Sequence, residues 1–213
     1  MENAEVMKHN AIIGKRAVEA LRKHGFPAEY YETAAEAREV LLSLIEDGSS
    51  VGFGGSVTIA QMDIQDELKT RNCTIYDHGK GKTPEEKLEF RHKEQDADYF
   101  LTGSNAVTLN GELYNVDATG NRVSAMVFGP KHVIVVAGVN KIVKDIEAAE
   151  KRVEEVAAPA NALRLNRETP CFHTGTCADC MSPQRLCNVA VIMKRRPPAT
   201  DMRIMIIGET MGY

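Results

Sequence analysis

The 213-residue sequence lacks an apolar run long enough to cross a membrane. Its longest apolar stretch, around residues 133–139, has the length of a strand, whereas a transmembrane helix needs roughly 20 residues. The N-terminus carries Glu2, Glu5 and Lys8 and lacks the apolar segment of a secretory signal peptide. These absences predict a cytoplasmic protein with no membrane partner, in which most cysteines stay reduced.

An excess of positive charge is also missing. Lys and Arg together number 26 against 30 Asp and Glu, which gives a formal net charge of -4. The basic run at residues 194–196 is too short to alter this balance and is typical of the solvated end of a strand. We therefore expect no nucleic-acid partner.

Several familiar cofactor and metal motifs do not occur. No lysine follows the glycines at residues 52–55, which excludes a Walker-type phosphate loop, and the full dinucleotide-binding spacing is absent. The sequence therefore has no ATP or NAD signature. The six histidines form no His-x-x-x-His pair, so a histidine-based zinc site is not expected either.

Helical and strand patterns alternate along almost the whole chain. Strands are predicted at residues 28–31, 50–52, 73–76, 99–102, 133–137, 189–193 and 202–207. Helices are predicted at residues 6–23, 33–47, 57–70, 123–128 and 144–156, with another beginning at residue 83. Such alternation predicts a single α/β domain over residues 1–213, with a doubly wound, mostly parallel sheet.

A β-hairpin is predicted within this pattern. Two strand-like segments, residues 106–109 and 112–116, flank Asn110 and Gly111. Asn-Gly is the preferred pair for a type I′ turn. The hairpin is therefore expected as an insertion in the parallel fold.

Glycine and hydroxyl residues follow two of the predicted strands. The first loop contains Gly52, Gly54, Gly55, Ser56 and Thr58, and the second contains Thr102, Gly103, Ser104 and Asn105. Glycine lets the backbone approach a ligand closely, and a helix N-terminus favours an anion. Ligands of doubly wound sheets bind at the carboxyl ends of strands, so both loops are candidate walls for an anion site. The alternative is that they are ordinary tight turns.

Other polar residues are expected near the same edge of the sheet. Asn140 and Lys141 follow the buried strand at residues 133–137 and supply an amide and an anion partner. Glu112 and Asp117 alternate onto opposite faces of the hairpin, so they do not form a carboxylate pair. Either acid could act alone as a base or nucleophile, or simply be solvated.

Four of the five cysteines lie in a segment of little periodicity at residues 170–187. Cys171, Cys177, Cys180 and Cys187 fall within 17 positions, and four thiolates can hold zinc or an iron–sulfur cluster. The spacing matches neither a regular zinc ribbon nor a bacterial ferredoxin. Unliganded thiols or disulfides are the alternatives. Cys73 is expected to be a core thiol.

Several stretches together resemble the LUD domain, the family of the bacterial lactate utilisation protein C. They are residues 52–56, 100–106, 111–123, 128–136 and 138–143. The resemblance implies a fold similar to glucosamine-6-phosphate deaminase, ribose-5-phosphate isomerase and CoA transferases. It also implies a role in oxidation of L-lactate to pyruvate beside iron–sulfur redox subunits.

Three functions remain open at this stage. The first is binding of a small anionic metabolite, as a subunit of an L-lactate-oxidising or related redox complex. The second is an autonomous sugar-phosphate isomerase or CoA-transferase-type enzyme, with Glu112 as nucleophile or Asp117 as base. The third is a metal- or iron–sulfur-dependent electron-transfer or assembly module organised by the cysteines. A homodimer is a further expectation.

Overall fold

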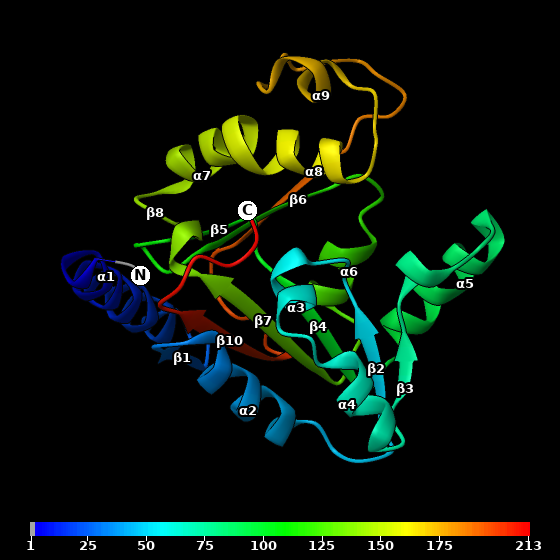
Figure 1. Cartoon of the computed structure of the whole chain (residues 1–213), viewed down its shortest axis with the longest axis horizontal. Coiled ribbons are helices and arrows are strands. Elements are labelled where there is room, and N and C mark those ends of the chain that lie inside the picture. Colours follow the sequence, from blue (N-terminus) through cyan, green and yellow to red (C-terminus); the bar gives the residue numbers. More distant parts are fainter. Residues whose placement is uncertain (1–2) are drawn as a thin grey trace.

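The structure is a computed structural model that describes residues 3–213, so Glu2 lies outside the described residues. Its centre is a six-stranded sheet in the order β1-β10-β7-β4-β2-β3, with every neighbouring pair parallel (Figure 1). The strands are β1 Ala28–Tyr31, β2 Ser50–Phe53, β3 Thr74–Tyr76, β4 Tyr99–Gly103, β7 His132–Gly138 and β10 Asp201–Ile207. The predicted doubly wound α/β fold is confirmed.

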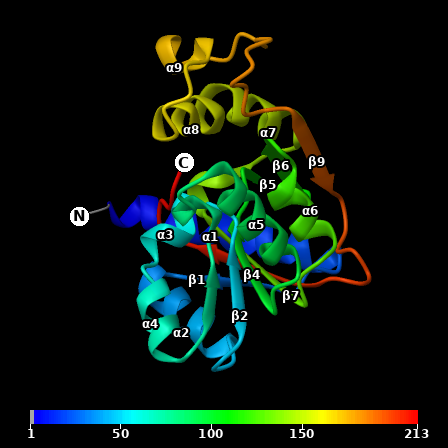
Figure 2. The ribbon, with the colours of Figure 1, turned by 90° about the vertical axis from the view of Figure 1, so that its right-hand side faces the viewer.

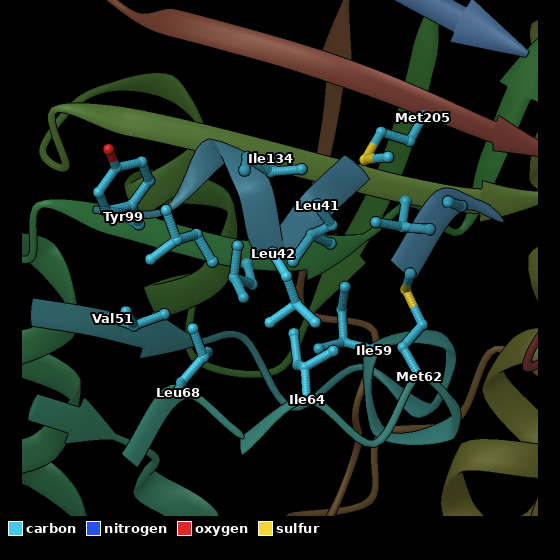
Figure 3. Close-up of a cluster of buried hydrophobic side chains, with 14 of the residues drawn as sticks. Leu41, Leu42, Val51, Ile59, Met62, Ile64, Leu68, Tyr99, Ile134 and Met205 are labelled. Atoms are coloured by element: carbon cyan, nitrogen blue, oxygen red, sulfur yellow. The ribbon is translucent and has the colours of Figure 1, made fainter. Parts of the chain in front are cut away.

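Helices cover both faces of this sheet because side chains alternate along each strand. In β4, Leu101 belongs to the core beneath α2, α3 and α4, whereas Phe100 belongs to the core beneath α1 and α6. Figure 3 shows the first core, where Leu41, Ile59 and Ile64 meet strand residues. The helices are α1 Ala4–Lys23, α2 Ala34–Leu44, α3 Val57–Gln61, α4 Gln65–Thr70, α5 Pro84–Gln95 and α6 Asn121–Val127.

A second, four-stranded sheet has the order β8-β5-β6-β9. Its strands are β5 Ala106–Thr108, β6 Leu113–Asp117, β8 Ile142–Val143 and β9 Val189–Met193. One face joins the core under α1, through Val107 and Leu113, and the other packs on α7 and the helical segment after it, through Ala106 and Tyr114. This sheet therefore carries a further helical layer, visible above β5 and β6 in Figure 2.

The helices of that layer differ in their bounds from the single helix predicted at residues 144–156. Helix α7 is Ile146–Arg152, because Asp145 caps its first turn by accepting from the Ala148 N–H at 3.0 Å. The helix then continues through a π-helical turn, Val153–Ala157, into α8, Ala158–Arg164. Short α9, Pro170–Thr174, follows within the cysteine segment.

The predicted helix at residues 57–70 is also interrupted. It divides into α3 and α4 at Asp63, which has a left-handed φ of 47°. The Arg38 guanidinium donates to the carbonyl oxygens of Met62 and Asp63 at 3.0 and 3.3 Å. Those carbonyls are therefore bonded outside the helix, and the chain turns there.

The predicted hairpin forms, but its turn is not type I′. A type I′ turn needs positive φ at both central residues, and here Gly111 has a φ of 89° while Asn110 is not left-handed. The Gly111 N–H donates to the Thr108 carbonyl at 3.0 Å, and the Thr108 N–H donates to the Glu112 carbonyl at 2.9 Å. This is a type I turn followed by a glycine bulge. Within the described residues, no helix is both long and apolar enough to span a membrane.

Candidate functional site

A cavity of about 720 Å³ opens beside the carboxyl ends of β2 and β4. These two strands are neighbours, but the chain leaves them in opposite directions across the sheet, toward β3 from β2 and toward β7 from β4. This is the switch point at which doubly wound sheets bind ligands. The side chains of α8 and the residues that follow it close the opposite wall.

The loop after β2 contributes mainly backbone. Gly54, Gly55 and Ser56 line the cavity, and Gly55 has a left-handed φ of 69°. The Ser56 hydroxyl is used inside the protein, where it accepts from the Ile59 N–H at 3.3 Å and caps α3. Because α3 has only five residues, its dipole adds little to anion binding. Positive charge must therefore come from side chains.

The loop after β4 is held by its own polar side chains. Gly103, Ser104 and Asn105 all line the cavity. The Ser104 hydroxyl donates to the Ala106 carbonyl at 2.8 Å, and the Asn105 amide oxygen accepts from the Val116 N–H at 2.9 Å. These side chains fix the hairpin against the end of β4 rather than pointing free groups at a ligand.

Arg122, at the start of α6, joins this loop to the hairpin. Its guanidinium pairs with Asp117 at 2.7 Å and donates to the amide oxygens of Asn105 and Asn115 at 2.9 and 2.7 Å. Asp117 is only 7% exposed and also accepts from the Val123 N–H at 3.0 Å. The Asp117 carboxylate is thus fully engaged, and it serves as an anchor for Arg122 and α6.

His78 and Glu94 form an oriented pair at the other side of the cavity. Glu94 is fully buried, and its carboxylate lies 2.8 Å from His78 Nδ1 and accepts from the His78 N–H at 2.9 Å. The opposite edge of the ring, with Nε2, lies beside Gly55. A carboxylate that bonds Nδ1 fixes the tautomer and leaves Nε2 for a ligand or a proton. Acid–base chemistry is therefore available at this wall.

Lys141 lies at the base of the cavity and is 5% exposed. Its Nζ donates to Thr58 Oγ1 at 2.8 Å, and the Thr58 hydroxyl in turn donates to the Met211 carbonyl at 3.2 Å. Burial, reinforced by Arg152 and Arg122, lowers the pKa of Lys141 to about 7. This amine therefore titrates near neutral pH.

The cavity lining is strongly positive. Seven Lys and Arg side chains line it against two carboxylates, Asp77 and Asp117. The cations are Lys80, Lys87, Arg91, Arg122, Lys141, Arg164 and Arg167. The Nε atom of Arg91 is buried without a hydrogen-bond partner in the described part of the chain. A chain with a net charge of -4 thus concentrates positive charge at one concave surface.

The remaining candidate residues lie outside the cavity lining. Gly52 is enclosed between Glu94 and Phe100. The Thr102 hydroxyl is buried and donates to the Gly103 carbonyl at 3.1 Å. Glu112 stays in the hairpin turn, 3.1 Å from the Thr108 hydroxyl. Asn140 holds the C-terminal segment through the Met211 N–H, and Thr58 reaches the site through Lys141.

Comparison with known proteins settles the family. Residues 14–207 match the family model of the LUD domain. The chain belongs to the LUD domain family. A solved structure of a DUF162 family protein from Deinococcus radiodurans, determined at 1.70 Å resolution, has the same fold. It is 12% identical, with a TM-score of 0.52 over 93% of this chain and 98% of that one. No curated protein matches the chain.

The site residues that the sequence analysis missed come from three places. His78 and Lys80 follow β3, so the strand-end rule that singled out the other loops applies to them equally. Arg122 lies within a stretch that resembles the family but has no motif of its own. Arg164 and Arg167 come from the additional helical layer, whose position over the strand ends no local pattern predicts.

The four tail cysteines of the LUD domain converge. Cys171, Cys177, Cys180 and Cys187 all line a second cavity of about 20 Å³, beside α8. All are free thiols, and among residues 3–213 no three metal-binding side chains lie close enough to hold an ion. Burial raises the pKa of Cys187, and nearby Cys177 and Cys180 add to the increase. Cys73 is buried just before β3, as expected of a core thiol.

Proposed function

We propose that this LUD domain binds a small anionic metabolite in the cavity beside β2 and β4. The observation that carries the proposal is that seven Lys and Arg side chains line one cavity with two carboxylates, so that six cations remain even when Lys141 is neutral. One of the carboxylates, Asp117, is already paired with Arg122. The uncompensated positive charge favours a ligand with one or more negative groups, and the glycine loops allow its close approach.

The size of the cavity narrows the choice of ligand. Ligand cavities of roughly 300–1,000 Å³ accommodate drug-sized molecules. At about 720 Å³, this one is far larger than L-lactate or pyruvate. We propose that a larger anion, such as a phosphorylated metabolite, fills it, and that lactate-type carboxylates bind only weakly. If the protein takes part in a lactate-oxidising complex, this cavity would then bind an anion other than lactate or pyruvate.

The position of Glu112 argues against the CoA-transferase alternative. Its carboxylate is held at the hairpin turn by Thr108 and does not line the cavity. The isomerase alternative retains support, because the His78–Glu94 pair provides an oriented proton carrier at the cavity wall.

Gly55 provides the direct test of anion binding. Asp and Asn have nearly the same shape and both tolerate left-handed φ, so Gly55→Asn is a matched control for Gly55→Asp. A Cβ at this position meets only the His78 ring, at 3.6 Å, which is ordinary van der Waals contact, and the two variants add the same bulk beyond it. We expect Gly55→Asp to weaken binding of a panel of phosphorylated and carboxylate ligands at least about tenfold, roughly 1.4 kcal/mol, relative to Gly55→Asn. Isothermal titration calorimetry measures the difference.

The panel includes L-lactate, pyruvate, sugar phosphates and inorganic phosphate. Equal affinities in the two Gly55 variants would contradict an anion site at this loop. Failure of every anion to bind the unchanged protein would contradict the proposed function itself.

We propose in addition that the four tail cysteines hold a single zinc ion. A cavity of about 20 Å³ accommodates one atom of the size of water and not a four-iron cluster. The Asp179 N–H donates to Cys177 Sγ at 3.4 Å, with Asp179 at a left-handed φ of 41°. Backbone N–H groups that bond a thiolate orient it for a metal. Binding would turn the four thiols inward, and it would stabilise a segment with little regular structure.

Metal analysis tests the zinc proposal. We expect about one zinc per chain and no visible absorption after purification under anaerobic conditions. Cys177→Ser and Cys180→Ser should lose the metal, whereas Cys73→Ser, outside the cluster, should retain it. Iron and sulfide in place of zinc would support the electron-transfer alternative. A metal-free protein would contradict both.

A further inference from the structure

We propose that Lys141 is a carbonyl-reactive amine, which forms an imine with a small aldehyde or ketone that also carries an anionic group. The inference rests on the proposed anion-binding function and adds a covalent step to it. Lys141 lies at the base of the cavity, buried, and directed toward Thr58.

The hydrogen bonds around Lys141 leave its lone pair free. The Thr58 hydroxyl uses its proton on the Met211 carbonyl, so its oxygen can only accept from Lys141. A neutral amine therefore uses an N–H on Thr58 and keeps its lone pair for another group. Within the described residues, Lys141 makes no salt bridge, which separates it from a lysine held by a carboxylate.

The neighbouring charges favour this neutral form. Arg122 and Arg152 are the charged groups that act on Lys141, and Asp117 is already paired with Arg122. Burial is the larger effect, and together these influences bring the pKa of Lys141 to about 7. A substantial fraction of the amine is therefore neutral at pH 7, whereas an ordinary lysine is almost wholly protonated.

The space around the amine also suits a reacting molecule. A Cβ placed on Gly103 would lie 3.5 Å from Lys141 Nζ, and one on Gly212 would lie 3.3 Å away. The same Cβ atoms would lie 2.7 Å from Ser56 Oγ and from Thr58 Oγ1, so both glycines serve close packing around the amine. The room for a reacting molecule comes from the cavity that Lys141 lines. The cationic lining of the same cavity then holds the anionic part of the molecule.

The proposed step is balanced without an oxidant or reductant. The Lys141 lone pair attacks the carbonyl carbon, the C=O π electrons move to oxygen, and a proton moves from nitrogen to that oxygen to give a carbinolamine. Loss of water from the carbinolamine leaves a C=N bond to Nζ. His78 lines the same cavity and, oriented by buried Glu94, is available to carry a proton.

Reductive trapping tests the proposal on the full chain. We would incubate the protein with pyridoxal 5′-phosphate, which combines an aldehyde with a phosphate, or with pyridoxal, which lacks the phosphate. Cyanoborohydride would fix any imine, and peptide mass spectrometry would locate it. We expect pyridoxal 5′-phosphate to label Lys141 at least about tenfold faster than exposed Lys144 at pH 7. Lys144 is a suitable comparison because it lies three residues away and its side chain is 86% exposed.

The two reagents separate the two proposals. Faster labelling of Lys141 by pyridoxal 5′-phosphate than by pyridoxal supports both the amine and the anion site. Equal labelling by the two reagents supports the amine and counts against the anion site. Labelling of Lys141 no faster than that of Lys144 with either reagent overturns the reactive amine, and it leaves the Gly55 binding test intact.

The pH dependence gives a second readout that a purely structural lysine would not produce. Labelling of Lys141 should rise with a midpoint near pH 7, whereas that of Lys144 should rise toward about pH 10.

The stability of the fold should depend on the protonation of the same group. The folded state disfavours the protonated amine, so its cost is full below about pH 7 and fades as pH rises toward the unfolded pKa of about 10.4. The Tm of Lys141→Met relative to the unchanged protein should therefore fall as pH rises through this window, and a constant difference would contradict the proposal.

Discussion

Replacement of Arg122 by Met is expected to destabilise the fold by about 3–5 kcal/mol, the usual cost of removing one partner from a buried ion pair. The side chain of Arg122 is 13% exposed, and that of its partner Asp117 is 7% exposed. Removal also leaves the amide oxygens of Asn105 and Asn115 without the bonds that they accept from the guanidinium. Urea unfolding followed by circular dichroism measures the loss.

Two further variants show whether the buried charge is the cause. Arg167→Met removes another cavity cation, one that is exposed, and should change stability by less than about 0.5 kcal/mol. Asp117→Asn added to Arg122→Met removes the unpaired carboxylate and should restore part of the loss. A double variant no more stable than Arg122→Met alone would mean that packing, and not the unpaired charge, sets the cost.

The role of Arg122 illustrates what the sequence could and could not predict. The hydrogen-bond partners of Arg122 lie in the loop after β4 and in the hairpin. Two of them, Asp117 and Asn105, were candidates from their positions in the sequence alone. The residue that joins them has no motif, and an arginine at the start of a helix is normally solvated unless it finds a buried partner. The strand pattern brings the elements together, but the pairing depends on where α6 packs.

The same distinction holds for the cavity as a whole. The glycine loops were predictable, because parallel strands place their carboxyl ends at one edge and β7 contains a continuous apolar run. Lys141 was predictable as a neighbour of that edge but not as a buried amine, since its burial depends on Thr58 and the C-terminal segment. Arg164 and Arg167, at and just after the end of α8, reach the cavity because the second sheet and its helical layer dock beside it. That docking is a tertiary event which no local periodicity contains.

The hairpin turn of this second sheet packs against α1, and Gly111→Ala is expected to disrupt that contact. Gly111 has a φ of 89°, and its α-carbon faces the backbone of α1. A Cβ there would overlap the Ala20 carbonyl, lying 2.6 Å from its carbon and 3.0 Å from the Leu21 nitrogen. Left-handed strain of about 1–2 kcal/mol and overpacking of about 1–3 kcal/mol together predict a loss of about 2–5 kcal/mol.

Gly48→Ala separates the two contributions to that loss. Gly48 has a φ of 77°, but a Cβ there meets nothing within 4 Å, so this variant reports backbone strain alone. We expect Gly111→Ala to be less stable than Gly48→Ala by the overpacking cost, in thermal or urea unfolding. Equal losses would mean that the hairpin moves away from α1 without cost. Because β6 carries Asn115 and Asp117, which hold Arg122 at the cavity, we also expect Gly111→Ala to weaken anion binding, although the residue lies outside the cavity lining.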